Sequence, residues 1–143
     1  MKFKNMFSPI QIGPMTVKNR FVVPPMGNNF ANSDGTWSDE SVAYYGERAK
    51  GQFGLITIEA TVVHKGAKGG PKKPCLYDDN SIESLKKITD ACHEEGAKVS
   101  IQLQNAGPEG NAKNAGAPIQ AASAIASADG RDIPEEVSTE KVY

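Results

Sequence analysis

Residues 19–27, with the sequence NRFVVPPMG, place the strongest constraint on the fold of this chain. An apolar strand enters the segment, and its two prolines must end the strand, because proline has no N–H group to pair with a neighbour. Gly27 follows without a Cβ atom, so a flat ligand can approach the main chain there. The segment predicts an open platform at a strand end, which is where barrel enzymes place their active sites.

Strand and helix patterns alternate along the rest of the chain. The expected elements, in chain order, are a hairpin at 8–18, a buried strand at 20–24, a helix at 39–50, a strand at 55–63, a helix at 81–95 and a strand at 97–103. This order predicts parallel β-α units with right-handed crossovers. Three such strands fit either an open doubly wound sheet or the first part of a barrel, and periodicity alone does not decide between them.

Capping chemistry predicts where the two helices begin and end. Ser38 is the expected N-cap of the first helix and Gly51 its end. Asn80 followed by Glu83 resembles a capping box for the second helix, which Gly96 should end. Spacings of three and four residues give that helix its expected apolar face, formed by Ile82, Leu85, Ile88, Thr89 and Cys92.

Composition narrows the class of protein. The 143 residues carry a net charge of −1 with scattered basic residues, so neither nucleic acid nor an acidic membrane surface is an expected partner. No run is long and apolar enough to cross a bilayer. Two cysteines and no secretory signal favour a cytoplasmic location. Four lysines of a Gly/Pro-rich stretch are interpreted as part of a solvated loop: Lys65, Lys68, Lys72 and Lys73.

A long segment follows the last expected strand. It runs from 105 to 137, is rich in Ala, Gly and Pro, and exceeds the usual length of connections in α/β proteins. Segments of this kind are more often functional than structural. Ser138, with Glu140 nearby, is expected to begin a third helix.

Four segments together point to a known family. In chain order they are FSPIQIGPMTVKNRFVVPPMG, YYGERAKGQFGLITIEAT, SIQLQNAG and PEEVSTEKV. In this order and spacing they resemble the FMN-dependent old yellow enzyme family, and most closely its branch of 2,4-dienoyl-CoA reductases, enoate reductases and NADH oxidases. The resemblance implies that residues 1–143 are the N-terminal portion, about three β/α units, of an FMN-binding TIM (β/α)8 barrel preceded by a β-hairpin. Residues 105–137 would be a long loop on the active-site side.

The resemblance also implies which residues would bind FMN: Pro24, Pro25, Met26, Gly27, Ala60 and Gln102. The Pro-Pro-Met-Gly run would form a shelf under the isoalloxazine ring, with the Gly27 backbone near the reactive N5. Ala60 would contact the flavin through its backbone. Gln102 would pair with the pyrimidine edge, because one amide offers both a donor and an acceptor.

These residues also have structural interpretations. A Pro-Pro-Met-Gly run is often a plain turn, and Gln102 could point into a polar barrel interior. A buried glutamine without a partner would be costly, which favours a ligand or a network around Gln102. Glu59 is interpreted as a structural ion-pair partner rather than a catalytic carboxylate. Arg48 is expected to pack or pair within the barrel wall, and Cys92 to belong to the core.

Two positions depart from the family pattern. Gly27 stands where many relatives carry Cys, Thr or Ala, so the flavin could lack a side-chain contact that tunes its potential. Asn105 stands where many relatives have His, and an amide cannot shuttle a proton near neutral pH.

The implied chemistry is that of an ene-reductase. NADH or NADPH would reduce FMN, which would pass a hydride to the activated C=C bond of a small molecule such as an enoate or a 2,4-dienoyl thioester. The phosphate loops, the substrate-binding residues and the iron–sulfur cluster of this branch would lie beyond residue 143.

The chain alone is therefore expected to bind FMN poorly, to be inactive, and to associate through exposed strand edges, with a homo-oligomer as one form. Two other classes remain open: a non-catalytic partial-barrel interaction module, and an unrelated α/β domain that binds a phosphate ligand.

Overall fold

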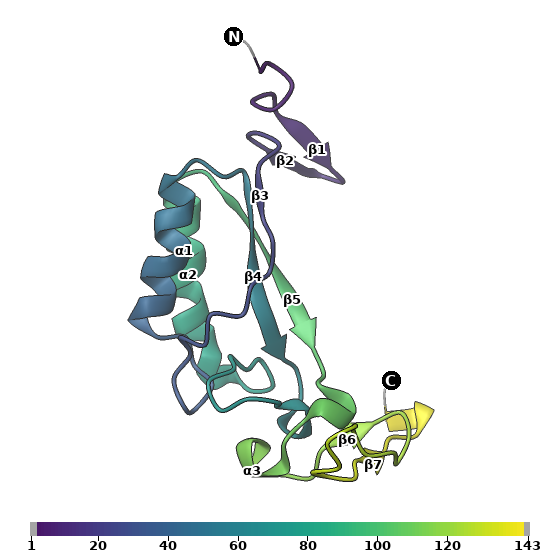
Figure 1. Cartoon of the computed structure of the whole chain (residues 1–143). Helices are drawn as coiled ribbons and strands as arrows, with labels where there is room; N and C mark the ends of the chain where they lie inside the picture. Colours follow the sequence, from purple (N-terminus) through teal and green to yellow (C-terminus); the bar gives the residue numbers. More distant parts are fainter. Residues whose placement is uncertain (1–2, 142–143) are drawn as a thin grey trace.

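A parallel sheet of three strands forms the centre of the computed structural model, which describes residues 3–141 (Figure 1). The strands are β3 (Val22–Val23), β4 (Leu55–Val62) and β5 (Lys98–Gln104), with β4 in the middle. Both strand pairs are parallel, as the alternating pattern predicts. The first strand is shorter than the expected 20–24, and its ladder stops before Pro24, which has no N–H group to extend it.

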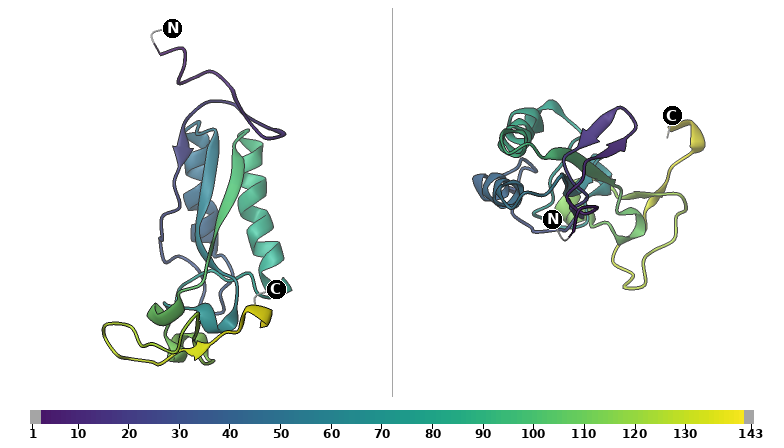
Figure 2. Two further views of the ribbon diagram at one scale, coloured as in Figure 1. Left: turned by 90° about the vertical axis from the view of Figure 1, so that its right-hand side faces the viewer. Right: turned by 90° about the horizontal axis from the view of Figure 1, so that it is seen from above.

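Two helices, α1 (Asp39–Lys50) and α2 (Ile82–Glu94), lie side by side against one face of this sheet (Figure 1 and Figure 2). The main core fills the space between the helices and the sheet and consists of Val23, Trp37, Tyr45, Ala49, Ile56, Ile58, Ile88, Cys92 and Ala97. Within the described residues no helix covers the opposite face, and the three strands do not close a barrel. None of the described helices is long and apolar enough to span a bilayer.

α1 begins and packs as its sequence predicts. The Ser38 hydroxyl accepts a hydrogen bond from the Ser41 N–H at 3.2 Å, which satisfies one of the free donors of the first turn. Tyr45 and Ala49, on the face that the spacing predicts to be buried, are 1% and 0% exposed. This packing fixes α1 against the sheet.

The two helices end in different ways. Gly51, the expected end of α1, has a φ of −66° and still donates its N–H to Glu47 O at 3.0 Å. The left-handed conformation falls one residue later, at Gln52, with a φ of +68°. Gly51 thus ends α1 as predicted, without itself adopting the left-handed conformation. Gly96 ends the second helix as predicted, with a φ of +72°.

The predicted capping box of α2 does not form. A short 3-10 turn, η2 (Asp79–Ser81), precedes the helix, and the Asp78 carboxylate accepts the N–H of Asn80 at 3.0 Å. Asn80 is thus inside this turn and is not available as the N-cap that would pair with Glu83. Ile82, the first residue of α2, is 53% exposed, so it is not part of the buried face that the spacing predicts.

The predicted hairpin is confirmed as β1 (Ile10–Ile12) and β2 (Met15–Val17), an antiparallel pair. It lies at the amino-terminal end of the sheet strands (Figure 1). The Lys18 ammonium donates to Glu95 O at 2.7 Å, just beyond α2. The Asn19 amide donates to the main-chain oxygen of Gln52 at 2.7 Å, just beyond α1. These two bonds attach the hairpin to the ends of both helices.

The predicted long loop, 105–137, lies at the opposite, carboxyl end of the sheet and contains short elements of its own (Figure 1). These are η3 (Gly107–Glu109), α3 (Ala112–Ala115), and the parallel pair β6 (Gln120–Ala121) and β7 (Glu135–Glu136). Where a third helix is expected, the chain forms a 3-10 turn, η4 (Thr139–Lys141). Residues 1–2 and 142–143 of the predicted unit lie outside the described residues.

A pair of isoleucines on α2 tests the helix-sheet packing. Ile88 is 0% exposed, whereas Ile82 is 53% exposed. We expect Ile88→Ala to lower the free energy of unfolding by about 2–5 kcal/mol, because it leaves a cavity in the core. Ile82→Ala, with the same change in side chain, should alter it by less than about 1 kcal/mol. Urea unfolding followed by circular dichroism measures both, and equal losses would contradict the assigned core.

Candidate functional site

The ladder between β4 and β5 contains a bulge near the carboxyl ends of the strands. Between two paired positions, β4 has both Glu59 and Ala60 where β5 has only Gln102. A bulge bends its strand and changes the direction of the local side chains, and bulges are common at barrel rims and next to active sites. It places two of the sequence-predicted contact residues, Ala60 and Gln102, across from each other.

The segment after β3 reaches the same place. We call residues 24–27 the shelf segment. Just after it, the Asn28 N–H donates a hydrogen bond to Glu59 Oε2 at 3.2 Å. A Cβ atom at Gly27 would lie 3.7 Å from the same oxygen. The structure thus brings Gly27, Ala60 and Gln102 to neighbouring positions at one end of the sheet.

Most of the predicted contact residues are accessible. Four are exposed (Pro24, Met26, Gly27 and Gln102) and two are half-buried (Pro25 and Ala60). Gln102 faces the open side of the sheet, because its neighbour Ile101 packs against the helix-covered core. Its amide makes no hydrogen bond within the described part of the chain, so it is free to bind a ligand. The argument from a buried, unpaired glutamine does not apply, because Gln102 is exposed.

Glu59 is the buried side chain that holds the shelf segment next to β4. Its side chain is 0% exposed, and its Oε1 has no hydrogen-bond partner among the described residues. Burial raises the pKa of Glu59, while the Asn28 N–H and the Lys73 ammonium oppose part of that rise. Its principal partner is thus a backbone N–H group, and the predicted ion pair is a longer contact of 4.0 Å to Lys73 Nζ. The contacts support a structural role for Glu59.

Helix α1 stabilises the bulge through a hydrogen bond to its buried tyrosine, Tyr45. The Glu59 N–H donates to the Tyr45 hydroxyl oxygen at 2.9 Å. Burial raises the pKa of Tyr45 to about 12, so this hydroxyl stays neutral. Arg48 stacks on the neighbouring ring, with its guanidinium carbon 3.2 Å from the Tyr44 centroid, and donates to Tyr44 O at 2.8 Å. Arg48 therefore packs within the wall, as the sequence predicts.

The loop between β4 and α2 is less solvated than its composition predicts. It begins with a 3-10 turn, η1 (Lys65–Ala67), and continues to Lys68, which is 5% exposed and donates to Ser33 O at 3.3 Å. Lys73 has a side chain that is 23% exposed. The expectation of a solvated loop is wrong for these two lysines, because both are covered by segments that are distant in sequence.

Sequence reasoning missed Lys73 as a site residue. A Cβ atom at Gly27 would lie 2.9 Å from Lys73 Nζ, so the ammonium is beside the shelf segment. A lysine in a Gly/Pro-rich stretch carries no local signal for such a position. The one local indication was the glycine at position 27, because the absence of a side chain there leaves space that a side chain from elsewhere in the chain can fill.

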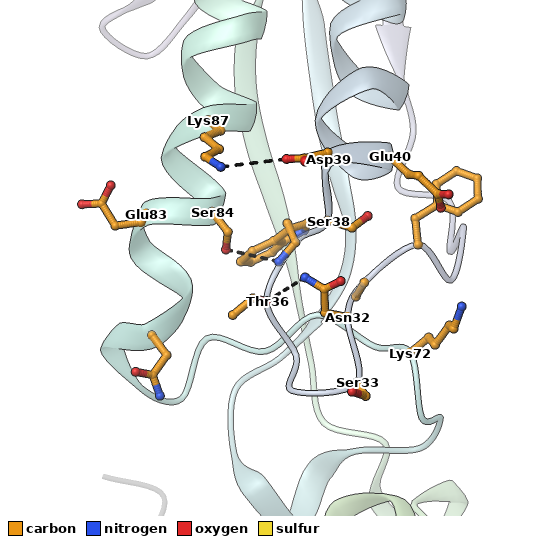
Figure 3. Close-up of a pocket in the computed structure, with 14 residues that line it drawn as sticks. Asn32, Ser33, Thr36, Ser38, Asp39, Glu40, Lys72, Glu83, Ser84 and Lys87 are labelled. Atoms are coloured by element: carbon orange, nitrogen blue, oxygen red, sulfur yellow. Dashed lines mark hydrogen bonds and ion pairs between the residues drawn. The ribbon is translucent and has the colours of Figure 1, made fainter.

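A pocket of about 760 Å³ lies between the N-terminal ends of α1 and α2 (Figure 3). Lys87 Nζ lies 3.9 Å from Asp39 Oδ1 there, and the Ser84 hydroxyl accepts the Trp37 N–H at 3.2 Å. Side chains of both charges line the pocket, and none of the six predicted contact residues does. This pocket is therefore separate from the predicted site.

A second pocket, of about 800 Å³, lies where the long loop folds back on the strand ends. Its lining includes Val63, just after β4, and Asn105, just after β5. Asn105 Oδ1 accepts the N–H of Gly107 at 2.9 Å, so this side chain stabilises the turn that begins the loop. The pocket shares the carboxyl end of the sheet with the bulge.

The chain matches the model of the NADH:flavin oxidoreductase / NADH oxidase family over residues 5–143. It is also similar to solved structures. An old yellow enzyme homologue from Zymomonas mobilis is 28% identical, with a TM-score of 0.85 over 96% of this chain and 41% of that one. The old yellow enzyme from Trypanosoma cruzi is 31% identical, with a TM-score of 0.85 over 99% of this chain and 44% of that one.

A complex of 2-naphthoyl-CoA reductase with 2-naphthoyl-CoA is 28% identical, with a TM-score of 0.87 over 98% of this chain and 23% of that one. In each of these three pairs nearly all of this chain is aligned. The chain spans less than half the length of each of these three structures.

We expect Glu59 to make the stability of the chain depend on pH. Because burial raises its pKa, the folded state binds the proton of this carboxyl more tightly than the unfolded state does. The stability that this group contributes is complete below the usual glutamate pKa of 4.5 and is lost as pH rises through the raised pKa. The free energy of unfolding should therefore fall relative to that of Glu59→Gln as pH rises from about 4.5 to about 8.

Urea unfolding at a series of pH values measures this difference. Glu94→Gln, which changes an exposed glutamate on α2, is the matched control and should follow the wild-type chain. A constant difference between the wild type and Glu59→Gln over the whole range would show that the Glu59 pKa is the same in the folded and unfolded states.

Proposed function

The chain belongs to the NADH:flavin oxidoreductase / NADH oxidase family, and from this we propose that it is the N-terminal part of an FMN-dependent ene-reductase. The substrates would be small molecules with activated C=C bonds, such as enoates or 2,4-dienoyl thioesters, and NADH or NADPH the reductant. Its fold is the first part of a (β/α)8 barrel, with the hairpin before it. FMN supplies the hydride-transfer chemistry when it is bound.

The observation that carries the proposal is the meeting of three strand ends. The shelf segment, Ala60 and the Gln102 amide lie together at the carboxyl end of the sheet, where barrel enzymes bind their ligands. Gly27 has no side chain, so its backbone is open to a flat ring. Gln102 has a free donor and a free acceptor, which suits the alternating edge of a pyrimidine. These features fit one side of a flavin ring.

Among residues 3–141, which the structure describes, the phosphate of FMN has no corresponding cradle. In barrels of this type the phosphate site is formed by the loops after the seventh and eighth strands, and the described sheet has three strands. We therefore propose that this chain by itself binds FMN weakly and does not turn over substrate. Cys75 and Cys92 are both buried and free, in keeping with a reducing cytoplasm and with an iron–sulfur cluster, if any, on cysteines elsewhere.

Flavin titration tests the proposal. We expect FMN to bind this chain with a dissociation constant above about 1 μM, measured by the change in flavin fluorescence. Gln102→Leu should weaken binding about tenfold, the effect of losing one or two hydrogen bonds. Gln11→Leu, in the hairpin at the other end of the molecule, should leave it unchanged.

Equal affinities for the wild type and Gln102→Leu would contradict the assigned role of Gln102. A sub-micromolar constant would contradict the expectation that the phosphate loops are needed. No binding at all would favour a non-catalytic partial-barrel module.

The open strand edges lead to a second proposal, that the chain self-associates. β3 and β5 are the two edges of the sheet, and Leu103 on β5 is 63% exposed. Unpaired edges with apolar side chains favour pairing with another chain. Sedimentation should show concentration-dependent association, and Leu103→Lys should shift the chain toward the monomer. Ile125→Lys is the control, because Ile125 is equally apolar and 69% exposed but lies in the long loop. A stable wild-type monomer would contradict the proposal.

A further inference from the structure

The Lys73 ammonium occupies the space that a side chain at position 27 would fill. A Cβ atom at Gly27 would lie 2.9 Å from Lys73 Nζ, which is closer than such atoms approach one another in proteins. A side chain at position 27 would therefore require the flexible end of Lys73 to shift away. A glycine at position 27 is what allows the ammonium to lie beside the shelf segment.

The hydrogen-bond donors of this ammonium remain free to bind a ligand. Its nearest carboxylate oxygen, Glu59 Oε2, is 4.0 Å away, which is too long for a hydrogen bond but close enough for a strong charge attraction. Glu59 is itself held by the Asn28 N–H and is 0% exposed. A fixed, buried carboxylate thus keeps the lysine at the shelf segment without using its N–H groups.

Resting on the proposed function, we propose that Lys73 is a further cofactor-binding residue, whose ammonium contacts the flavin ring beside Gly27 in place of a side chain from position 27. A positive charge at this point would bind the electron-rich polar edge of the ring and would favour its reduced, anionic form. Lys73 and Glu59 together form a charged pair under the ring, with the glutamate as the positioning residue.

Two variants remove this contact by different routes. Lys73→Met keeps the length of the side chain and removes the charge. Gly27→Ala keeps the lysine and displaces its ammonium, because the added Cβ atom would overlap it. Lys73→Arg restores a positive charge, and Lys72→Met removes an exposed charge from the neighbouring position of the same loop.

The experiment is a titration of the whole 143-residue chain with riboflavin and, separately, with FMN, followed by the amide resonances of Gly27, Ala60 and Gln102. Riboflavin has the ring without the phosphate, so it separates a contact with the ring from a contact with the phosphate. We expect Lys73→Met and Gly27→Ala to weaken the binding of both ligands about tenfold. Lys73→Arg should retain most of the affinity, and Lys72→Met all of it.

Each remaining outcome contradicts a different statement. Unchanged riboflavin affinity in Lys73→Met overturns the assignment of Lys73 and leaves the proposed function standing. A loss confined to FMN overturns it as well, by placing the lysine at the phosphate. If these amides do not shift with millimolar flavin in the wild type, the proposed flavin site and the role of Lys73 both fail. If Lys73→Met does not fold, Lys73→Gln, which also removes the charge and leaves the shelf segment unchanged, decides by the same criteria.

Discussion

The hydrogen bond from the Asn28 N–H to the buried Glu59 carboxylate joins the strand ends on which the site depends. β3 pairs with β4 over two residues, so the ladder alone gives the shelf segment little support. A carboxylate that is 0% exposed is costly unless it is partnered, and its partners here are the main chain after the shelf segment and the Lys73 ammonium. The need to satisfy one buried acid therefore fixes both the backbone and the charge at this end of the sheet.

The sheet also has two faces of different character. The helix-covered face carries isoleucines such as Ile56 and Ile58 and supplies the main core. The open face carries hydroxyls, and Thr57 and Ser100 lie 2.9 Å apart there, oxygen to oxygen, in a cross-strand hydrogen bond. Polar side chains make this face tolerant of water. The same polar side chains would suit the interior of a barrel that surrounds the polar edge of a cofactor. This face of the sheet is therefore compatible both with exposure to water and with enclosure in a barrel.

Local patterns predicted the parts of the structure that local forces determine. The bounds of α1 and the hairpin follow from capping residues, apolar spacing and a Gly-Pro turn, all read within a few residues. The capping box at Asn80 failed because a 3-10 turn replaced it, and the choice between two local hydrogen-bond patterns depends on packing. The burial of Lys68, the partial covering of Lys73 and the bulge at Ala60 depend on contacts with distant segments, so the sequence carries no short-range sign of them. The family resemblance pointed to Gly27 and Gln102 as cofactor contacts, but it did not point to the neighbouring pair of Glu59 and Lys73.

The attachment of the hairpin has a consequence for how such a protein can change over evolutionary time. Lys18 and Asn19 bond to main-chain oxygens, at Glu95 and Gln52, and these two bonds place no demand on the identity of the side chains there; one further bond, from Lys18 to Gln52 Oε1 at 3.2 Å, does depend on a side chain. Mutational drift in the helix-end turns can proceed without loosening that end of the molecule. The long loop at the other end is attached in a similar way, because the Asn114 side-chain amide donates to the main-chain oxygen of Gly69 at 3.1 Å.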